Sequence, residues 1–297
     1  AVTGNCSPKD FETMMQLTYL TFTAPRRDDD AFASYKNRSK AELQNMDLNP
    51  SSSFSDSITS TLYSKHPRTL RMKADMVDKM NYDKILSMYQ DRFKDASDFT
   101  FILVGNVDVE AVKPLIESYL GSLPSINRKE TFKDNHIAMR KGICKNEFIR
   151  QQETPKVNNF ICYSGTCKYN LRNEILMSMT DQLLNFIYTE KVREDEGGTY
   201  GVYPMGQLIK YPTEKAVLQI FFNTAPDKQE KLIKIIYDEA EAFAKNGPDE
   251  ASLNKVKEYM LKKHSEDLKE NGYWLNSIDE YLYTGIDPVK DYEQIIN

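Results

Sequence analysis

The segment Val192–Val202 holds the residues whose types and spacing best suit chemistry. It reads Val-Arg-Glu-Asp-Glu-Gly-Gly-Thr-Tyr-Gly-Val, so Arg193 closes a helical pattern and Tyr200 opens a strand pattern. The glycine pair between them allows a tight turn, which can bring both side chains to one edge of a sheet. A guanidinium and a phenol side by side are fixed hydrogen-bond donors. Such donors suit a peptide carbonyl, or the oxyanion that develops when it is attacked.

The same two residues also admit a structural interpretation. Arg193 could interact with the carbonyl groups at the C-terminus of its helix, where a positive charge is favourable. Tyr200 could be a half-buried residue of the strand that it opens. The residue types alone leave both interpretations open.

Metal ligands and nucleophiles are the next candidates for chemistry. The histidines are His66, His136 and His264, and none has a second histidine three or four residues away. Neither H-E-x-x-H nor the inverted H-x-x-E-H is therefore present, and no G-x-S-x-G motif occurs. His264 lies in the charged stretch 262–266, which predicts a solvated or capping position on a helix. We predict no catalytic residue and no metal ligand in this chain.

Composition narrows the function classes further. The 297 residues are 40% hydrophobic and 28% charged, which is typical of a packed globular protein. A net charge of −5 argues against non-specific nucleic-acid binding, which needs clustered lysine and arginine. No apolar run approaches the roughly 18 residues of a membrane span. The four cysteines form neither a disulfide framework nor a C-x-x-C zinc site, and they fit a bacterial cytoplasm or periplasm equally well.

Periodicity and turn signals predict the elements that must position these residues. Capping residues stand before several helices, namely Ser7, Asn81, Asp108 and Asp249. Further helices are expected over 30–45, 53–63, 170–193 and 227–245. Strands are expected at 1–4, 99–105, 144–150, 157–165, 199–209 and 215–223.

These elements divide into two α+β domains, each with a sheet packed against helices. We expect the first domain over 1–125, with its N-terminal strand truncated, and a polar linker over 126–140. The second domain would cover 141–297, with its final helix and strand truncated. On this view the chain is a fragment of a longer protein.

Several segments together resemble the pitrilysin/insulinase (M16) family of zinc peptidases. Phe99–Pro124 is similar to that family's strand–helix signature, and Phe22–Arg26 resembles the end of the first helix in one half. Arg193 and Tyr200, seven residues apart, are similar to an arginine–tyrosine pair of the C-terminal half. Asn271–Leu275 matches a recurrent helix break.

The resemblance implies a fold and a division of labour. Each domain would be a mostly antiparallel sheet against helices, as in the LuxS/mitochondrial-processing-peptidase-like metallohydrolase fold. Two homologous halves would close around an unfolded peptide, with zinc held by the N-terminal half, in the same chain or a partner subunit. This chain would be the C-terminal half, inactive alone. Its Arg193 and Tyr200 would grip the substrate and support the tetrahedral intermediate.

Two other hypotheses stay open on the sequence. Catalytically inactive subunits with the same fold serve as scaffolds or partners, and such a subunit has no need of Arg193 and Tyr200. The H-x-x-E-H motif in an accompanying half would separate a peptidase from a scaffold. The third possibility is an unrelated α+β binding domain, which requires the signature matches to be chance.

Overall fold

The structure is a computed structural model that describes residues 2–194 and 201–297, without the side chains of residues 193 and 194. The chain divides into two compact units, Ala1–Glu147 and Phe148–Asn297. Helices and an antiparallel sheet confirm the α+β class. The sheet lies in the second unit.

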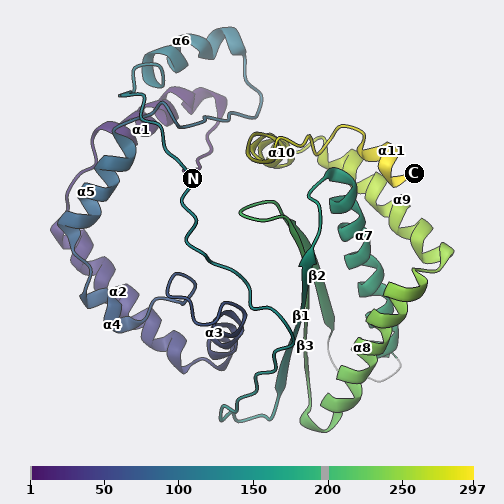
Figure 1. Cartoon of the computed structure of the whole chain (residues 1–297). Coiled ribbons are helices and arrows are strands. Elements are labelled where there is room, and N and C mark those ends of the chain that lie inside the picture. The colour runs from purple at the N-terminus through teal and green to yellow at the C-terminus, as the bar shows by residue number, and fades with distance from the viewer. Residues whose placement is uncertain (1, 195–200) are drawn as a thin grey trace. The chain divides into compact units, whose positions relative to one another are not determined.

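The first unit is built from helices in the part that is described (Figure 1). Their bounds are α1 Phe11–Thr23, α2 Asp29–Leu48, α3 Pro50–Leu62, α4 Ala74–Asp78, α5 Tyr82–Phe93 and α6 Val109–Tyr119. Two of the caps expected in this unit are confirmed, while the Ser7 side chain makes no capping bond to a backbone amide. Asn81 accepts a hydrogen bond from the Lys84 amide at 2.9 Å, and Asp108 accepts from the Glu110 and Ala111 amides. These bonds satisfy amides that a helix leaves free at its N-terminus.

The expectation of a strand at 99–105 is wrong for the described residues. A strand needs a hydrogen-bonded neighbour, and no described segment pairs with this one. The aromatic side chains of the segment pack on helices instead. The Phe22 ring of α1 lies 4.8 Å from the Phe99 ring and 5.8 Å from the Phe101 ring, centroid to centroid. The aromatic and β-branched residues of 99–105, which favour strands, therefore serve packing against a helix here rather than sheet formation.

The expected strands at 1–4 and 144–150 do not form either, as far as the chain is described. Ile143 and Ile149 are almost fully exposed, so no neighbouring element covers them. Asn146 is tied to α3 by its side chain, which donates to Ser57 Oγ at 2.7 Å and Thr61 Oγ1 at 2.9 Å. These side-chain bonds hold the segment to α3 without any pairing of strands.

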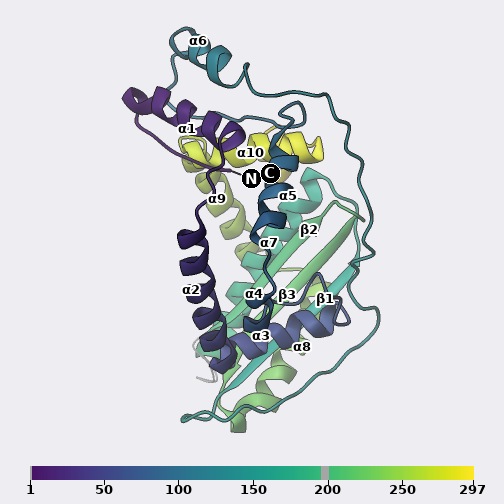
Figure 2. The same cartoon turned by 90° about the vertical axis from the view of Figure 1, so that its left-hand side faces the viewer.

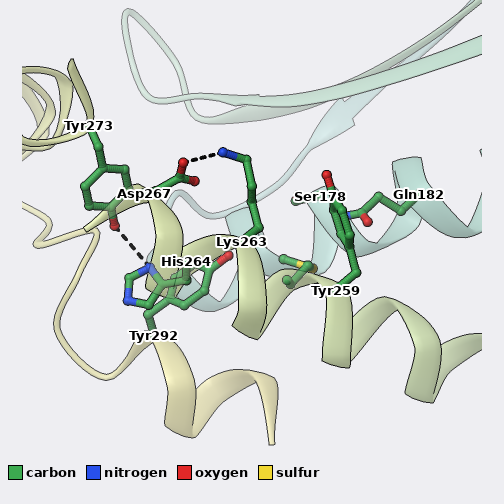
Figure 3. Close-up of a pocket in the computed structure, with 9 residues that line it drawn as sticks. Ser178, Gln182, Tyr259, Lys263, His264, Asp267, Tyr273 and Tyr292 are labelled. Atoms are coloured by element: carbon green, nitrogen blue, oxygen red, sulfur yellow. Dashed lines mark hydrogen bonds and ion pairs between the residues drawn. The ribbon is translucent and has the colours of Figure 1, made fainter. Parts of the chain in front are cut away.

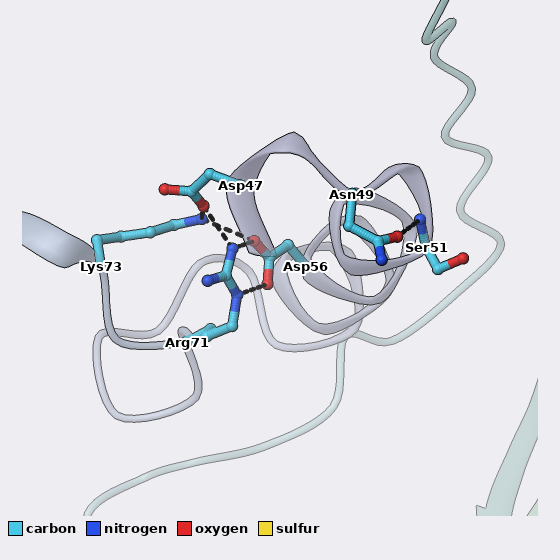
Figure 4. A network of polar contacts seen from close by, with 6 residues as sticks. All are labelled: Asp47, Asn49, Ser51, Asp56, Arg71 and Lys73. Atoms are coloured by element: carbon cyan, nitrogen blue, oxygen red, sulfur yellow. Dashed lines mark hydrogen bonds and ion pairs between the residues drawn. The ribbon is translucent and has the colours of Figure 1, made fainter. Parts of the chain in front are cut away.

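Two polar clusters hold the first unit together. In one, Arg71 and Lys73 bridge Asp47 at the end of α2 and Asp56 of α3, with nitrogen–oxygen distances of 2.6–2.9 Å (Figure 4). In the other, the buried Asp95 accepts hydrogen bonds from the amides of Ser97, Ile126 and Arg128.

The second unit is a three-stranded antiparallel sheet with helices on one face (Figure 1). The strands are β1 Val157–Thr166, β2 Val202–Ile209 and β3 Lys215–Thr224, in the order β1-β3-β2, and they run side by side (Figure 2). The helices are α7 Leu171–Tyr188, α8 Gln229–Asn246, α9 Glu250–Asp267, α10 Asn271–Thr284 and α11 Tyr292–Ile296.

Helix α7 packs directly on β2. Gly206 of β2 makes this close approach possible, because a Cβ atom there would collide with the Met177 and Asp181 side chains of α7. The expected helix over 170–193 is confirmed in kind, with Asn170 accepting from the Asn173 amide at 2.8 Å. After Tyr188 the helix widens into a six-residue π-helix, η2 Thr189–Glu194.

Candidate functional site

The predicted pair Arg193 and Tyr200 falls at the limit of what is described. The backbone of Arg193 belongs to η2, whereas its side chain and the whole of Tyr200 lie outside the described residues. Their roles therefore stay predictions. The structure does describe the residues that flank the pair.

A single buried cluster anchors both flanks. Val192 precedes Arg193 and is 0% exposed, and Val202 follows Tyr200 by two residues and is 4% exposed. Both belong to an apolar cluster shared by α7, η2, the sheet and α8, together with Leu184, Tyr188, Ile220, Phe222, Leu232 and Ile236. The helix end and the strand start thus pack into the same core.

A buried amide lies at the same end of the sheet. Asn159 of β1 and Val202 of β2 both oppose Phe222 of β3 in the register. The Asn159 Oδ1 atom accepts from Gln229 Nε2 at 3.1 Å, and Asn159 is 8% exposed. Its Nδ2 atom has no partner in the part of the chain that is described. Nothing in the sequence marked this residue, because burial of one strand asparagine depends on the register.

His264 corrects a prediction. It is 5% exposed rather than solvated, and its ring stacks on Tyr292 with centroids 4.2 Å apart (Figure 3). Its Nδ1 atom is 3.2 Å from the Tyr273 hydroxyl. A depression of about 290 Å³ between α7 and α9 is bordered by these rings, Lys263 and Asp267. The charged neighbours of His264 in sequence gave no guide to its burial, because the rings that cover it belong to distant residues.

A carboxyl group with a raised pKa lies near the start of α7. Burial raises the pKa of Glu174 to about 7, and the nearby Glu280 carboxylate adds to this, while a hydrogen bond with Tyr169 opposes it. The Tyr169 hydroxyl donates to Glu280 Oε1 at 2.9 Å. Glu280 lies more than 100 residues from Tyr169 and Glu174 in sequence, so only the folded chain brings it to them.

The described residues form neither a metal-binding site nor a reactive thiol site. They contain no group of three or more histidine, cysteine or acidic residues that could hold a metal ion. The four cysteines are free, and burial raises the pKa of the Cys162 thiol, which keeps it protonated. Within the described ranges, no helix has the length and apolar character to cross a membrane.

Known proteins give an independent comparison. Residues 79–260 match the family model described as peptidase M16 inactive domain. A zinc protease PQQL-like protein of Arabidopsis thaliana is 24% identical over 294 residues, which cover 91% of this chain and 30% of that protein. The chain therefore spans about a third of the length of such curated relatives.

Solved structures agree on the fold. The periplasmic protease PqqL from Escherichia coli superimposes with a TM-score of 0.79 at 19% identity, covering 97% of this chain and 32% of that one. The first half of the same protease also superimposes, with a TM-score of 0.69 at 13% identity, covering 99% of this chain and 65% of that one. The fold of this chain is thus found in that protease, and it occurs within the protease's first half.

Proposed function

This chain belongs to the peptidase M16 inactive-domain family, and we propose that it is the non-catalytic half of a zinc metalloendopeptidase. In this proposal the chain forms one wall of a chamber that holds an unfolded peptide. A second half, in the same chain or a partner subunit, binds the zinc and carries the H-x-x-E-H motif.

The family match carries the proposal, and two further observations support it. Relatives named zinc proteases are about three times as long as this chain, which leaves room for a half of another kind. The described residues do not fit a zinc site, because a catalytic zinc usually needs three protein ligands and no such group is present among them. The zinc chemistry is therefore assigned to the other half.

Arg193 and Tyr200 supply hydrogen-bond donors in this proposal. The guanidinium and the phenol bind the substrate carbonyl and hold it more tightly as negative charge develops on its oxygen. Support comes from the flanks, since Val192 and Val202, on either side of the pair, are both buried in one apolar cluster. Donors on a fixed backbone need little reorganisation when the charge appears.

The test uses the intact protein with its zinc-bearing half. Replacing Arg193 by Ala, or Tyr200 by Phe, should lower kcat on the order of 10²-fold, the usual cost of one oxyanion donor, with bound zinc unchanged. Lys191→Ala is the matched control, because Lys191 lies exposed in the same π turn. Equal losses in all three variants would contradict a specific role for the pair.

The alternative is a catalytically inactive partner subunit of the same fold. The family description as an inactive domain is compatible with both. Mixing separately purified halves separates them, with peptide cleavage as the readout. Peptide cleavage by the mixture but by neither half alone supports the proposal. Metal-dependent cleavage by this chain alone would overturn it. A mixture of folded halves that cleaves no peptide would favour the inactive partner subunit.

A further inference from the structure

The π-helix η2 differs from the helix that it extends. Each residue of an α-helix advances about 100°, so every fourth residue drifts by about 40° from the one before. Leu184, Tyr188 and Val192 are spaced by four and would drift by about 80° in total. All three are nonetheless buried in the same cluster, at 1%, 0% and 0% exposure. The π turn has more residues per turn, which brings Val192 back onto the core side.

Tyr188 lies where the α-helix changes into the π-helix. Its ring is completely buried, and its hydroxyl donates to the Ile236 carbonyl of α8 at 3.3 Å. Burial raises the pKa of the Tyr188 phenol, so it stays a neutral donor. Helix α8 also contacts η2 directly. The phenol thus links the start of the π turn to a neighbouring helix through a polar bond inside an apolar layer.

We infer that Tyr188 is a positioning residue, whose bond to α8 fixes the π turn and thereby the backbone that carries Arg193. This inference rests on the role proposed for Arg193 above. Apolar contacts alone are non-directional and would permit rotation of the turn about the helix axis. A buried hydroxyl with a single carbonyl partner defines one orientation, since losing that partner leaves a polar group unsatisfied.

Tyr188→Phe removes the hydroxyl and keeps the ring. In the intact protease we expect kcat to fall about tenfold, with KM and bound zinc unchanged. The control is Tyr169→Phe, which also removes the hydroxyl of a buried tyrosine in the same unit, near the other end of α7. An unchanged kcat in Tyr188→Phe, or an equal fall in the control, would overturn the inference.

A double variant separates positioning from general stability. If Tyr188 acts through Arg193, then Tyr188→Phe should cause no further loss of kcat in an Arg193→Ala protein. A multiplicative loss in the double variant would show that Tyr188 acts by another route.

Hydrogen exchange keeps the inference testable if the proposed function fails. Should Arg193→Ala leave kcat unchanged, the role of Arg193 is refuted, but the backbone claim still stands or falls on its own. Amides 189–194 should exchange at least several-fold faster in Tyr188→Phe than in the parent or in Tyr169→Phe. Equal exchange in all three proteins would refute the positioning role as well.

Discussion

Two carboxyl pairs, one in each unit, are held in opposite ways. In the first unit, a hydrogen bond from Arg71 lowers the pKa of Asp56, and one from Lys73 lowers that of Asp47. In the second unit, burial raises the pKa of Glu174 to about 7 and also raises the pKa of Asp181.

The difference follows from what each unit packs. The second unit stacks helices on a sheet, and the layer between them excludes water, which penalises charge. The described part of the first unit packs helix on helix, with Arg71 and Lys73 bridging their ends. Val192, which directly precedes Arg193, is buried in the layer of the second unit.

The largest expected effect comes from a substitution in the apolar cluster between the helices and the sheet of the second unit. Phe222→Ala removes a fully buried ring from the cluster and should cost about 3–5 kcal/mol of unfolding free energy. Tyr203→Ala is the control, because Tyr203 is adjacent in register but 54% exposed on the other face. It should change stability by less than about 1 kcal/mol. Denaturant unfolding followed by circular dichroism measures both, and similar costs would mean that the layer is not the main support.

A smaller effect is expected at Asp95 in the first unit. Burial alone would raise its pKa, but hydrogen bonds from Ser97, Arg128 and Ile126 outweigh this and hold the pKa well below its usual range. The stabilisation is present above about pH 4 and is lost as pH falls through the depressed pKa. Asp95→Asn should therefore lower Tm at pH 7 and lower it less at pH 3. A pH-independent loss would contradict a role for the charge.

The smallest effect is expected at Glu174 and has the opposite sign. A raised pKa means that the folded state holds the proton more tightly, so stability falls as pH rises from about 4.5 through about 7. Glu174→Gln mimics the neutral form and should stabilise the protein by about 1 kcal/mol at pH 8, after allowance for partial solvent screening. At pH 5 the variant and parent should match. Thermal melts at both pH values check this, and destabilisation at pH 8 would refute it.

Local signals predicted the helices well. Asn81 and Asp108 cap their helices as expected, and the helix that leads to Arg193 begins at the expected asparagine. The strands 157–165, 199–209 and 215–223 correspond to the three strands of the sheet within a few residues. These features depend on near neighbours in sequence, so composition and spacing reveal them.

Features that depend on distant partners were not predictable. The run 99–105 has strand composition, but it packs against Phe22 because no described strand pairs with it. His264 has charged neighbours, yet Tyr273 and Tyr292 bury it. The candidate site divides in the same way, since the sequence pointed to Arg193 and Tyr200 but not to Tyr188 or Asn159.

The sequence by itself determined the class of the protein and the positions of most helices, and it singled out Arg193 and Tyr200 as candidate donors. Capping, periodicity and residue type are local properties, and the chain carries them before it folds. Only the tertiary structure decided which polar groups are buried, which carboxyls hold protons and how the end of α7 is anchored. Those properties arise from water exclusion between elements that meet only in the folded state.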